Sequence, residues 1–383
     1  MPATAWAAPT WSIAPSPNPA SQQGVLSGLS CTSDRACTAV GHYSKGDAEM
    51  TLAEAWNGTK WTIEPTPNPT GALVSILSGV SCTSDRACTA VGHSINVINH
   101  PGFYVTLAEA WNGTRWAIQP TPNPTGATDS TLSGVSCTLA TACTAVGSYD
   151  NSHGAGVTLA EVWNGTKWSA EPTPNPTGSY SFLSGVSCTS ARACTAVGHG
   201  YNGTLAEAWN GTKWAIEPTP NPTGEQGSFS LNGVSCTSAR ACTAVGDYGN
   251  PNTLYDRTLA EAWNGTKWAI QSTPNPTGEQ GSTLSGVSCT LATACSAVGY
   301  AYNFGAPAVT LAEAWNGTKW AIEATPSPSG AQSRSLSGVS CTSATACSAV
   351  GNYHNATGAD VTLAEAWNGT KWAIEPTPNP TGA

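Results

Sequence analysis

The sequence predicts an all-β fold: a seven-bladed β-propeller of four-stranded antiparallel blades, with one disulfide inside each blade. Three observations lead to this prediction. The run TLAEAWNGTKW recurs seven times with few changes, a pair of cysteines at constant spacing accompanies each copy, and no stretch shows helical periodicity. The first cysteines of successive copies lie 48 to 55 residues apart, which is the length of one propeller blade.

One copy, residues 77–126, shows how the four strands of a blade arise. LSGVSC (77–82) and CTAVGH (88–93) are short β-prone segments on either side of a five-residue turn, and TLAEAW (106–111) and RWAIQP (115–120) flank Asn-Gly. The main alternative is a β-solenoid, but solenoid turns recur every 20–30 residues and lack two-residue hairpins. The four segments therefore favour a propeller blade.

Asn-Gly between two β-prone segments predicts a hairpin. In WNGTKW (56–61) we expect a type I′ turn, because both central residues of that turn need a positive φ and Asn and Gly tolerate it. The first Trp of the motif recurs at 56, 111, 163, 209, 263, 315 and 367.

The fourteen cysteines form seven Cys-x5-Cys pairs, which we interpret as disulfides across the first hairpin of each blade. A disulfide needs a Cα separation of about 4.4–6.8 Å, which facing strands provide. A metal site is the alternative, but Cys-x5-Cys without a histidine in the same copy is poor zinc spacing. We therefore expect no metal and no cofactor, and an oxidising compartment, so a secreted or cell-surface protein. The pairs are Cys31/Cys37, Cys82/Cys88, Cys137/Cys143, Cys188/Cys194, Cys236/Cys242, Cys289/Cys295 and Cys341/Cys347.

The copies differ from one another almost entirely at one end of the predicted blades. We call this end the loop face: it carries the connections from second to third strands and from blade to blade. The opposite end, the turn face, carries the disulfide turns and the Asn-Gly turns and hardly varies. His and Tyr residues gather in the variable loops, and they suit ligand contact, although loops also drift for lack of packing constraints. The candidate ligand-binding residues are His42, Tyr43, His93, Tyr104, Tyr149, His153, His199, Tyr201, Tyr248, Tyr300, Tyr353 and His354.

Two repeated residue types have a chemical alternative to a structural role. The Trp pairs could stack against sugar rings, but their near-identity favours packing between blades. The Glu of TLAE recurs seven times, and we expect it to be half-buried and to accept backbone or indole hydrogen bonds. Catalysis usually needs carboxylates in unequal environments, so we predict no catalytic residues and no enzymatic activity. These glutamates are Glu54, Glu109, Glu161, Glu207, Glu261, Glu313 and Glu365.

Residues 1–25 form a degenerate extra half-repeat, in which Trp6 and Trp11 keep the Trp spacing but Asn-Gly is lost. Trp6, Trp11 and Ile13 could close the ring or pair with a neighbouring molecule, which would give a filament. They could equally be a remnant of repeat amplification. The propeller itself is predicted at 26–383, in units of about 26–71, 77–126, 132–178, 183–224, 231–278, 284–330 and 336–383.

The runs LSGVSCTSxxxCTAVG and TLAEAWNGTKW resemble the repeats of secreted bacterial β-propeller proteins. The ending Gly58-x-x-Trp61 is also distantly similar to the Asp-box of sialidase-like propellers, although Trp56 stands where that box carries Asp. Sialidases cluster three arginines, whereas Arg35, Arg86, Arg192 and Arg240 recur in the disulfide turns of separate copies. The resemblance implies the fold and an extracellular setting, and it implies no activity.

We therefore expect a non-enzymatic extracellular binding or scaffold protein, one version of which is a multivalent binder of carbohydrate or other surface ligands. The alternatives are a filament subunit, whose partner is another copy of the chain, and a glycan-processing enzyme. The net charge of −9 indicates no basic patch for nucleic acid, and no apolar run reaches the ~18 residues of a membrane span.

Overall fold

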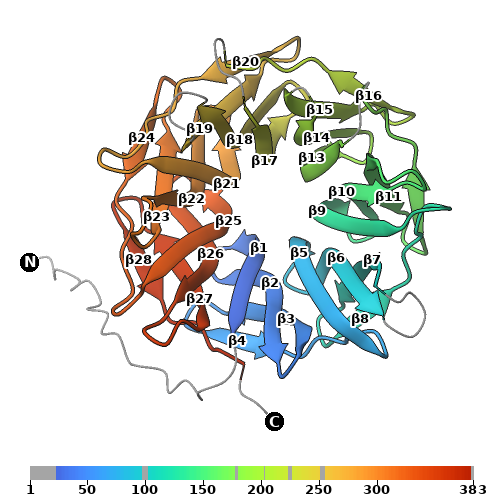
Figure 1. The fold of residues 1–383 in the computed structure, drawn as a ribbon, viewed down its shortest axis with the longest axis horizontal. Coiled ribbons are helices and arrows are strands. Elements are labelled where there is room, and N and C mark those ends of the chain that lie inside the picture. Colours follow the sequence, from blue (N-terminus) through green and yellow to red (C-terminus); the bar gives the residue numbers. More distant parts are fainter. Residues whose placement is uncertain are drawn as a thin grey trace, which may run out of the picture.

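The structure is a computed structural model that describes residues 23–96, 102–176, 180–201, 203–222, 227–250 and 255–380. Four-stranded units follow one another around a common centre, and the last unit lies beside the first (Figure 1). We number these units 1 to 7 from β1–β4 to β25–β28. The extra half-repeat with Trp6, Trp11 and Ile13 lies outside the described residues, apart from the start of β1.

Each unit contributes one strand to each of four positions, from the centre to the rim (Figure 1). The innermost strands are β1 (Gly24–Ser33), β5 (Ala72–Ser84), β9 (Asp129–Leu139), β13 (Phe182–Ser190), β17 (Phe229–Ser238), β21 (Gly281–Leu291) and β25 (Ser333–Ser343). The second strands are β2 (Ala36–Lys45), β6 (Ala87–Asn96), β10 (Ala142–Asp150), β14 (Ala193–Gly200), β18 (Ala241–Asn250), β22 (Ala294–Tyr302) and β26 (Ala346–His354). The third strands are β3 (Ala48–Trp56), β7 (Tyr104–Trp111), β11 (Gly156–Trp163), β15 (Gly203–Trp209), β19 (Tyr255–Trp263), β23 (Val309–Trp315) and β27 (Asp360–Trp367). The rim strands are β4 (Trp61–Glu64), β8 (Trp116–Gln119), β12 (Trp168–Glu171), β16 (Trp214–Glu217), β20 (Trp268–Gln271), β24 (Trp320–Glu323) and β28 (Trp372–Glu375).

The 28 strands of the described residues form six sheets, where the sequence predicts seven separate ones. Five sheets have four strands, and one has eight. In the eight-stranded sheet, one parallel pair, Glu49 with Val74, joins unit 1 to unit 2. Every unit keeps the same antiparallel order of four strands, so the difference comes from this single contact near the loop face.

The predicted disulfides are confirmed in all seven units. Cys82 and Cys88 face each other on β5 and β6, and Ser84 pairs with Ala87, so only Asp85 and Arg86 form the turn. The turn is therefore shorter than the five residues expected. The Cα atoms of the seven disulfides lie 3.9–4.0 Å apart, closer than the separation expected. The disulfides are Cys31–Cys37, Cys82–Cys88, Cys137–Cys143, Cys188–Cys194, Cys236–Cys242, Cys289–Cys295 and Cys341–Cys347.

The second cysteine of each disulfide is buried in the hydrophobic core, a feature that is not predicted from the sequence. Cys143 is 3% exposed, whereas its partner Cys137 is partly buried. Cys143 Sγ lies 3.6 Å from Thr89 Oγ1 of the preceding unit, and the hydroxyl is the donor because a disulfide sulfur carries no hydrogen. Equivalent contacts join Cys194 to Thr144, Cys242 to Thr195 and Cys295 to Thr243. The disulfides therefore pack between units as well as within them. The buried cysteines are Cys37, Cys88, Cys143, Cys194, Cys242, Cys295 and Cys347.

The Asn-Gly hairpin forms, but not as the predicted type I′ turn. Trp56 pairs with Trp61, which leaves a loop of four residues, and only Gly58 has a positive φ, of 89°. The Asn57 side chain organises the loop: its Oδ1 accepts hydrogen bonds from the backbone N–H groups of Thr59 at 3.0 Å and Lys60 at 3.1 Å. An Asx-type turn therefore replaces the backbone conformation that Asn would otherwise adopt.

The innermost strands approach one another closely because each carries a glycine at the same level. A Cβ on Gly28 would lie 2.9 Å from the Cα of Gly79, and a Cβ on Gly338 would lie 3.2 Å from the carbonyl oxygen of Ser27. The glycine at this level thus allows each pair of neighbouring units to meet at the centre. The same holds for units 7 and 1.

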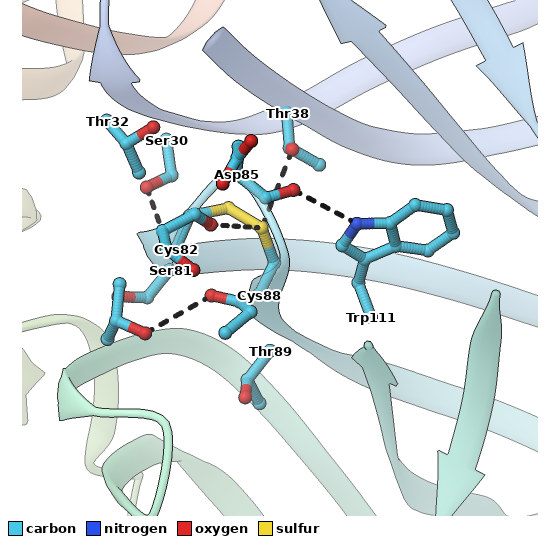
Figure 2. Close-up of a disulfide and its surroundings, with 12 residues drawn as sticks. Ser30, Thr32, Thr38, Ser81, Cys82, Asp85, Cys88, Thr89 and Trp111 are labelled. Atoms are coloured by element: carbon cyan, nitrogen blue, oxygen red, sulfur yellow. Dashed lines mark hydrogen bonds between the residues drawn. A yellow bond between two sulfur atoms is a disulfide. The ribbon is translucent and has the colours of Figure 1, made fainter. Parts of the chain in front are cut away.

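A repeated hydrogen bond also links neighbouring units. The Cys82 N–H donates to Ser30 Oγ of unit 1 at 2.9 Å (Figure 2), and the Cys31 N–H donates to Ser340 Oγ of unit 7 at 3.0 Å. The same bond joins every other neighbouring pair. Units 7 and 1 lie in different sheets, yet they meet through the contacts that join consecutive units.

The hydrophobic core lies between the units. Val40 and Ala53 of unit 1 pack against Leu77, Leu107 and Trp116 of unit 2, all of them buried. An equivalent cluster joins units 7 and 1. Each unit therefore buries one side of its sheet only when a neighbour is present, as in other repeat folds.

Candidate functional site

The strand register places all the variable segments at one end of the molecule. Lys45 pairs with Ala48 at the turn from second to third strand, and Gly24 pairs with Tyr43 where unit 1 begins. Trp56 and Trp61 pair at the opposite end, close to the disulfide turn. The loop face and the turn face are thus the two ends of the strands.

Four of the candidate tyrosines support the loop face from inside. Tyr43, Tyr149, Tyr248 and Tyr353 occupy the same position in four second strands, and each packs against the hydrophobic cluster of its own unit. Burial raises the pKa of Tyr353. These rings are partly covered, and Tyr300 lies beside Tyr302 with ring centroids 6.2 Å apart.

Three histidines occupy one equivalent position, directly after Ala-Val-Gly in the second strand. His42 Nε2 lies 3.2 Å from Glu49 Oε2, His93 meets the Tyr104 ring edge-on at 4.8 Å, and His199 stacks on Phe182 at 5.0 Å. Burial lowers the pKa of all three imidazoles, although Glu49 opposes this at His42. The three rings are therefore neutral near pH 7.

His354 and His153 are more open to solvent. His354 Nε2 lies 3.0 Å from Asp360 Oδ1, and the same carboxylate oxygen accepts a hydrogen bond from Asn352 Nδ2 at 2.6 Å. His153 lies in an exposed turn in which its N–H donates to Asn151 Oδ1. The structure thus spreads the twelve candidates around the loop face and does not gather them into one pocket.

Exposed aromatic side chains also lie on the loop face. Tyr201 and Tyr104 were predicted, with 70% and 38% of their surface exposed. Phe103, Tyr180 and Phe304 were not predicted, and they are 45%, 53% and 78% exposed. Their place in the variable segments is visible in the sequence. Phe has no hydrogen-bonding group, and Tyr180 lies in a connection between blades, whereas the predicted residues lie between second and third strands.

The loop face is also acidic. Eight described acids lie on or next to it, with only Lys45, Arg257 and Arg334 as cations. Burial raises the pKa of Asp247 to about 6, while the Asn232 side chain that donates to it at 3.0 Å acts in the opposite direction. The acids are Asp47, Glu49, Asp129, Asp150, Asp247, Asp256, Glu279 and Asp360.

The second Trp of each hairpin is a packing residue. Trp116 is 4% exposed, and its Nε1 donates at 3.0 Å to Glu64 Oε2 on the rim strand of the preceding unit. Five of the other six units have the same bond to Glu or Gln, with the bond of Trp61 running to Glu375 of unit 7. The indole acceptors are therefore rim-strand residues and not the Glu of TLAE.

The seven TLAE glutamates are fully buried, not half-buried as predicted. Burial raises the pKa of Glu109 to about 8, and the Thr51 side chain of the preceding unit opposes this rise in part. The other six also have raised pKa values with burial as the main cause. They are near-equivalent carboxylic acids without access to solvent, which suits no acid–base chemistry on a bound substrate.

The described residues contain no group of three or more His, Cys, Asp or Glu arranged to hold a metal ion. Within the same ranges there is no helix with the length and apolar character needed to cross a lipid bilayer.

Comparison with known proteins gives the fold. No family model and no curated protein matches the sequence. Among solved structures, U3-55K matches with a TM-score of 0.52 and 12% identity over 85% of this chain and 87% of that chain. YCF48 from Cyanidioschyzon merolae matches with a TM-score of 0.50 and 15% identity over 91% and 97%. Both are β-propeller proteins, so the all-β propeller fold is confirmed.

Proposed function

We propose that the chain is a secreted, seven-bladed propeller that binds a protein partner through its loop face and catalyses no reaction. The seven disulfides fit an oxidising extracellular environment, and they lie at the end opposite the loop face. The propeller serves as a rigid frame that presents a different loop from each blade.

The observation that carries the proposal is the exposed aromatic side chains on the face where the copies differ. Tyr201 and Phe304 expose most of their surface to solvent. Aromatic residues are enriched at the centres of protein interfaces, because they bury a large area at a small entropic cost. Repeats whose frame is held constant while their exposed loops differ are well suited to recognition.

The charge of the loop face defines the partner further. Eight acids against three cations favour a segment rich in Lys and Arg, since complementary charge speeds encounter and selects partners. Phe103 and Phe304 would supply the apolar contacts of such an interface.

The proposal is tested with a displayed library of random 12-residue peptides. We expect the selected peptides to be rich in basic and aromatic residues and to bind with micromolar affinity. The triple variant Phe103→Ser, Tyr201→Ser and Phe304→Ser should weaken them at least tenfold. These side chains are exposed, so the variant should fold, which circular dichroism would check.

A matched control uses the turn face. Leu139 and Leu291 are 62% and 61% exposed there, and five other units carry Ser at this position. The double variant Leu139→Ser and Leu291→Ser should bind the selected peptides as the wild type does. Selected peptides that bind the triple variant unchanged would contradict a loop-face interface.

A further inference from the structure

The turn face carries most of the positive charge of this acidic protein. It consists of two turns per unit, residues 33–36 and 57–60 in unit 1 and their equivalents. Eleven of the 14 Lys and Arg lie there, with only Asp34 and Asp85 as acids. The net charge of −9 hides this separation, so composition alone gave no sign of a basic surface. The cations are Arg35, Lys60, Arg86, Arg115, Lys167, Arg192, Lys213, Arg240, Lys267, Lys319 and Lys371.

In four of the units an arginine stem packs against the hairpin turn that carries a second cation. A Cβ on Gly58 would lie 2.9 Å from Arg35 Cγ, so the Arg35 stem lies against the hairpin turn that carries Lys60. Arg86, Arg192 and Arg240 lie in the same way against Gly113, Gly211 and Gly265. In the other three units Thr141, Thr293 and Thr345 take the place of the arginine.

These cations have no acidic partners among the described residues. The two contacts between a basic side chain and a carboxylate found in that part of the chain both involve His and lie on the loop face. Like charges on neighbouring turns repel one another, and a bound anion would relieve that repulsion.

Partly exposed indoles stand beside the cations. The Trp111 Nε1 donates at 3.2 Å to the Asp85 carbonyl of the disulfide turn (Figure 2), and the Trp56 Nε1 donates to the Asp34 carbonyl at 3.1 Å. These bonds fix the indoles in place. A recess of about 60 Å³ lies between Trp56 and Trp111, and one of about 90 Å³ lies between Trp367 and Trp56. Ser and Thr side chains contribute to the lining of both, and so do two carboxyl side chains in each, Glu64 and Asp85 in the first and Asp34 and Glu375 in the second.

A larger recess of about 390 Å³ lies between units 5 and 6, towards the rim. Its volume falls in the range of small-molecule sites. Ser272 lines it where five other units carry Pro, and Gln271 replaces the acidic Glu of most units. No carboxylate lines this recess. The lining includes Gln271, Ser272, Trp315, Thr318, Lys319 and Trp320.

We propose that the turn face binds an acidic polysaccharide, with the cations holding its carboxylates and the indoles stacking against its pyranose rings. Aromatic faces suit the apolar faces of sugars, and hydroxyl-lined recesses suit their hydroxyl groups. A chain that engages several units at once gains strength through high effective concentration. This binding surface is separate from the loop face and does not depend on it.

The same features fit other polyanions less well. Only Leu139 and Leu291 are exposed large apolar residues in the described turns themselves, which is little for insertion into an anionic lipid surface. An extracellular setting also favours polysaccharide over nucleic acid.

The experiment measures binding of an oligogalacturonate to the full chain by calorimetry, at 20 and 200 mM salt. We expect binding that weakens at the higher salt, because exposed charges are then screened. The variant Arg35→Thr, Arg86→Thr, Arg192→Thr and Arg240→Thr should bind at least tenfold more weakly. It should fold, since three units already carry Thr at this position. Intrinsic Trp fluorescence should change on binding oligogalacturonate.

A matched control removes equal charge from each face. Arg86→Thr with Arg240→Thr should weaken binding, whereas Lys45→Thr with Arg257→Thr on the loop face should not. Polyphosphate, phosphatidylglycerol vesicles and duplex DNA are tested in parallel, and each should bind more weakly. The proposal is overturned by an absence of oligogalacturonate binding, by unchanged binding in the four-arginine variant, or by equal or tighter binding of any of these three.

Discussion

Glu109 offers a direct test of how the units pack. Its side chain is fully buried between units 1 and 2, and burial raises its pKa from 4.5 to about 8. Replacing it with Gln keeps the shape and a neutral polar group, but removes the proton that can be lost. The variant Glu109→Gln therefore isolates the titration from the packing.

The sign follows from proton linkage. Between pH 4.5 and 8 the folded chain keeps a proton on Glu109 that the unfolded chain releases, so the free energy of unfolding falls as pH rises. One such group changes this free energy by about 1.4 kcal/mol per pH unit. Its stabilisation is fully present below pH 4.5 and is lost as pH rises through 8, a total of up to about 5 kcal/mol.

The assay is urea unfolding at pH 5, 6, 7 and 8, followed by Trp fluorescence with the disulfides intact. The wild type should be most stable at pH 5. At pH 5 the free energy of unfolding of Glu109→Gln should lie within about 1 kcal/mol of the wild-type value. At pH 8 it should exceed the wild-type value, because the free energy of unfolding of the variant depends less steeply on pH. Asp47→Asn, which removes an exposed carboxylate on the loop face, is the control and should leave the slope unchanged.

A wild-type stability that rises from pH 5 to pH 8 would refute this reasoning. So would a Glu109→Gln variant with the wild-type slope, because Glu109 would then be ionised in the folded chain.

Two further changes test the centre and the hairpins, both read from urea midpoints. Gly28→Ala places a Cβ 2.9 Å from Gly79 Cα and should lower the free energy of unfolding by about 1–3 kcal/mol. The control Gly249→Ala meets only ordinary contacts and should lower it by less than about 0.5 kcal/mol. Equal effects of the two variants would contradict the close approach at the centre. Asn112→Gly removes the Oδ1 that accepts hydrogen bonds from the N–H groups of Thr114 and Arg115. The variant should lower the free energy of unfolding by about 1–2 kcal/mol. An unchanged or higher free energy of unfolding would instead indicate a type I′ turn.

Features internal to one repeat could be predicted from the sequence. The pairing of Cys82 with Cys88 follows from two β-prone segments around a short turn, and the two faces follow from strand order. The hairpin was predicted, but its turn type was not. Asn has two ways to form a tight turn, and only the side-chain hydrogen bonds of Asn57 show which one is used.

Features that arise between repeats could not be predicted in the same way. The burial of Glu109, the bond from Trp116 to Glu64 and the contact of Cys143 with Thr89 depend on how one unit lies against the next. The spacing of two cysteines shows that they can pair, but it does not show which of the two a neighbouring unit covers.

The variable loops set a further limit on prediction. The pair of Glu49 and Val74, which merges two sheets, depends on segments that differ in every copy. On the loop face, the pattern predicted where variation lies, but not that Tyr43 and Tyr149 would face inwards.

The contact of unit 7 with unit 1 repeats the contacts of all other neighbours, down to the bond from the Cys31 N–H to Ser340 Oγ. No unit is therefore special as the first or the last. A circularly permuted chain that began at another unit could reach the same arrangement. Exchange between near-identical coding copies could likewise move whole units, each with its own loop, to new positions around the centre without altering the frame. Binding surfaces of this kind could diversify by rearranging existing loops, and not only by point mutation.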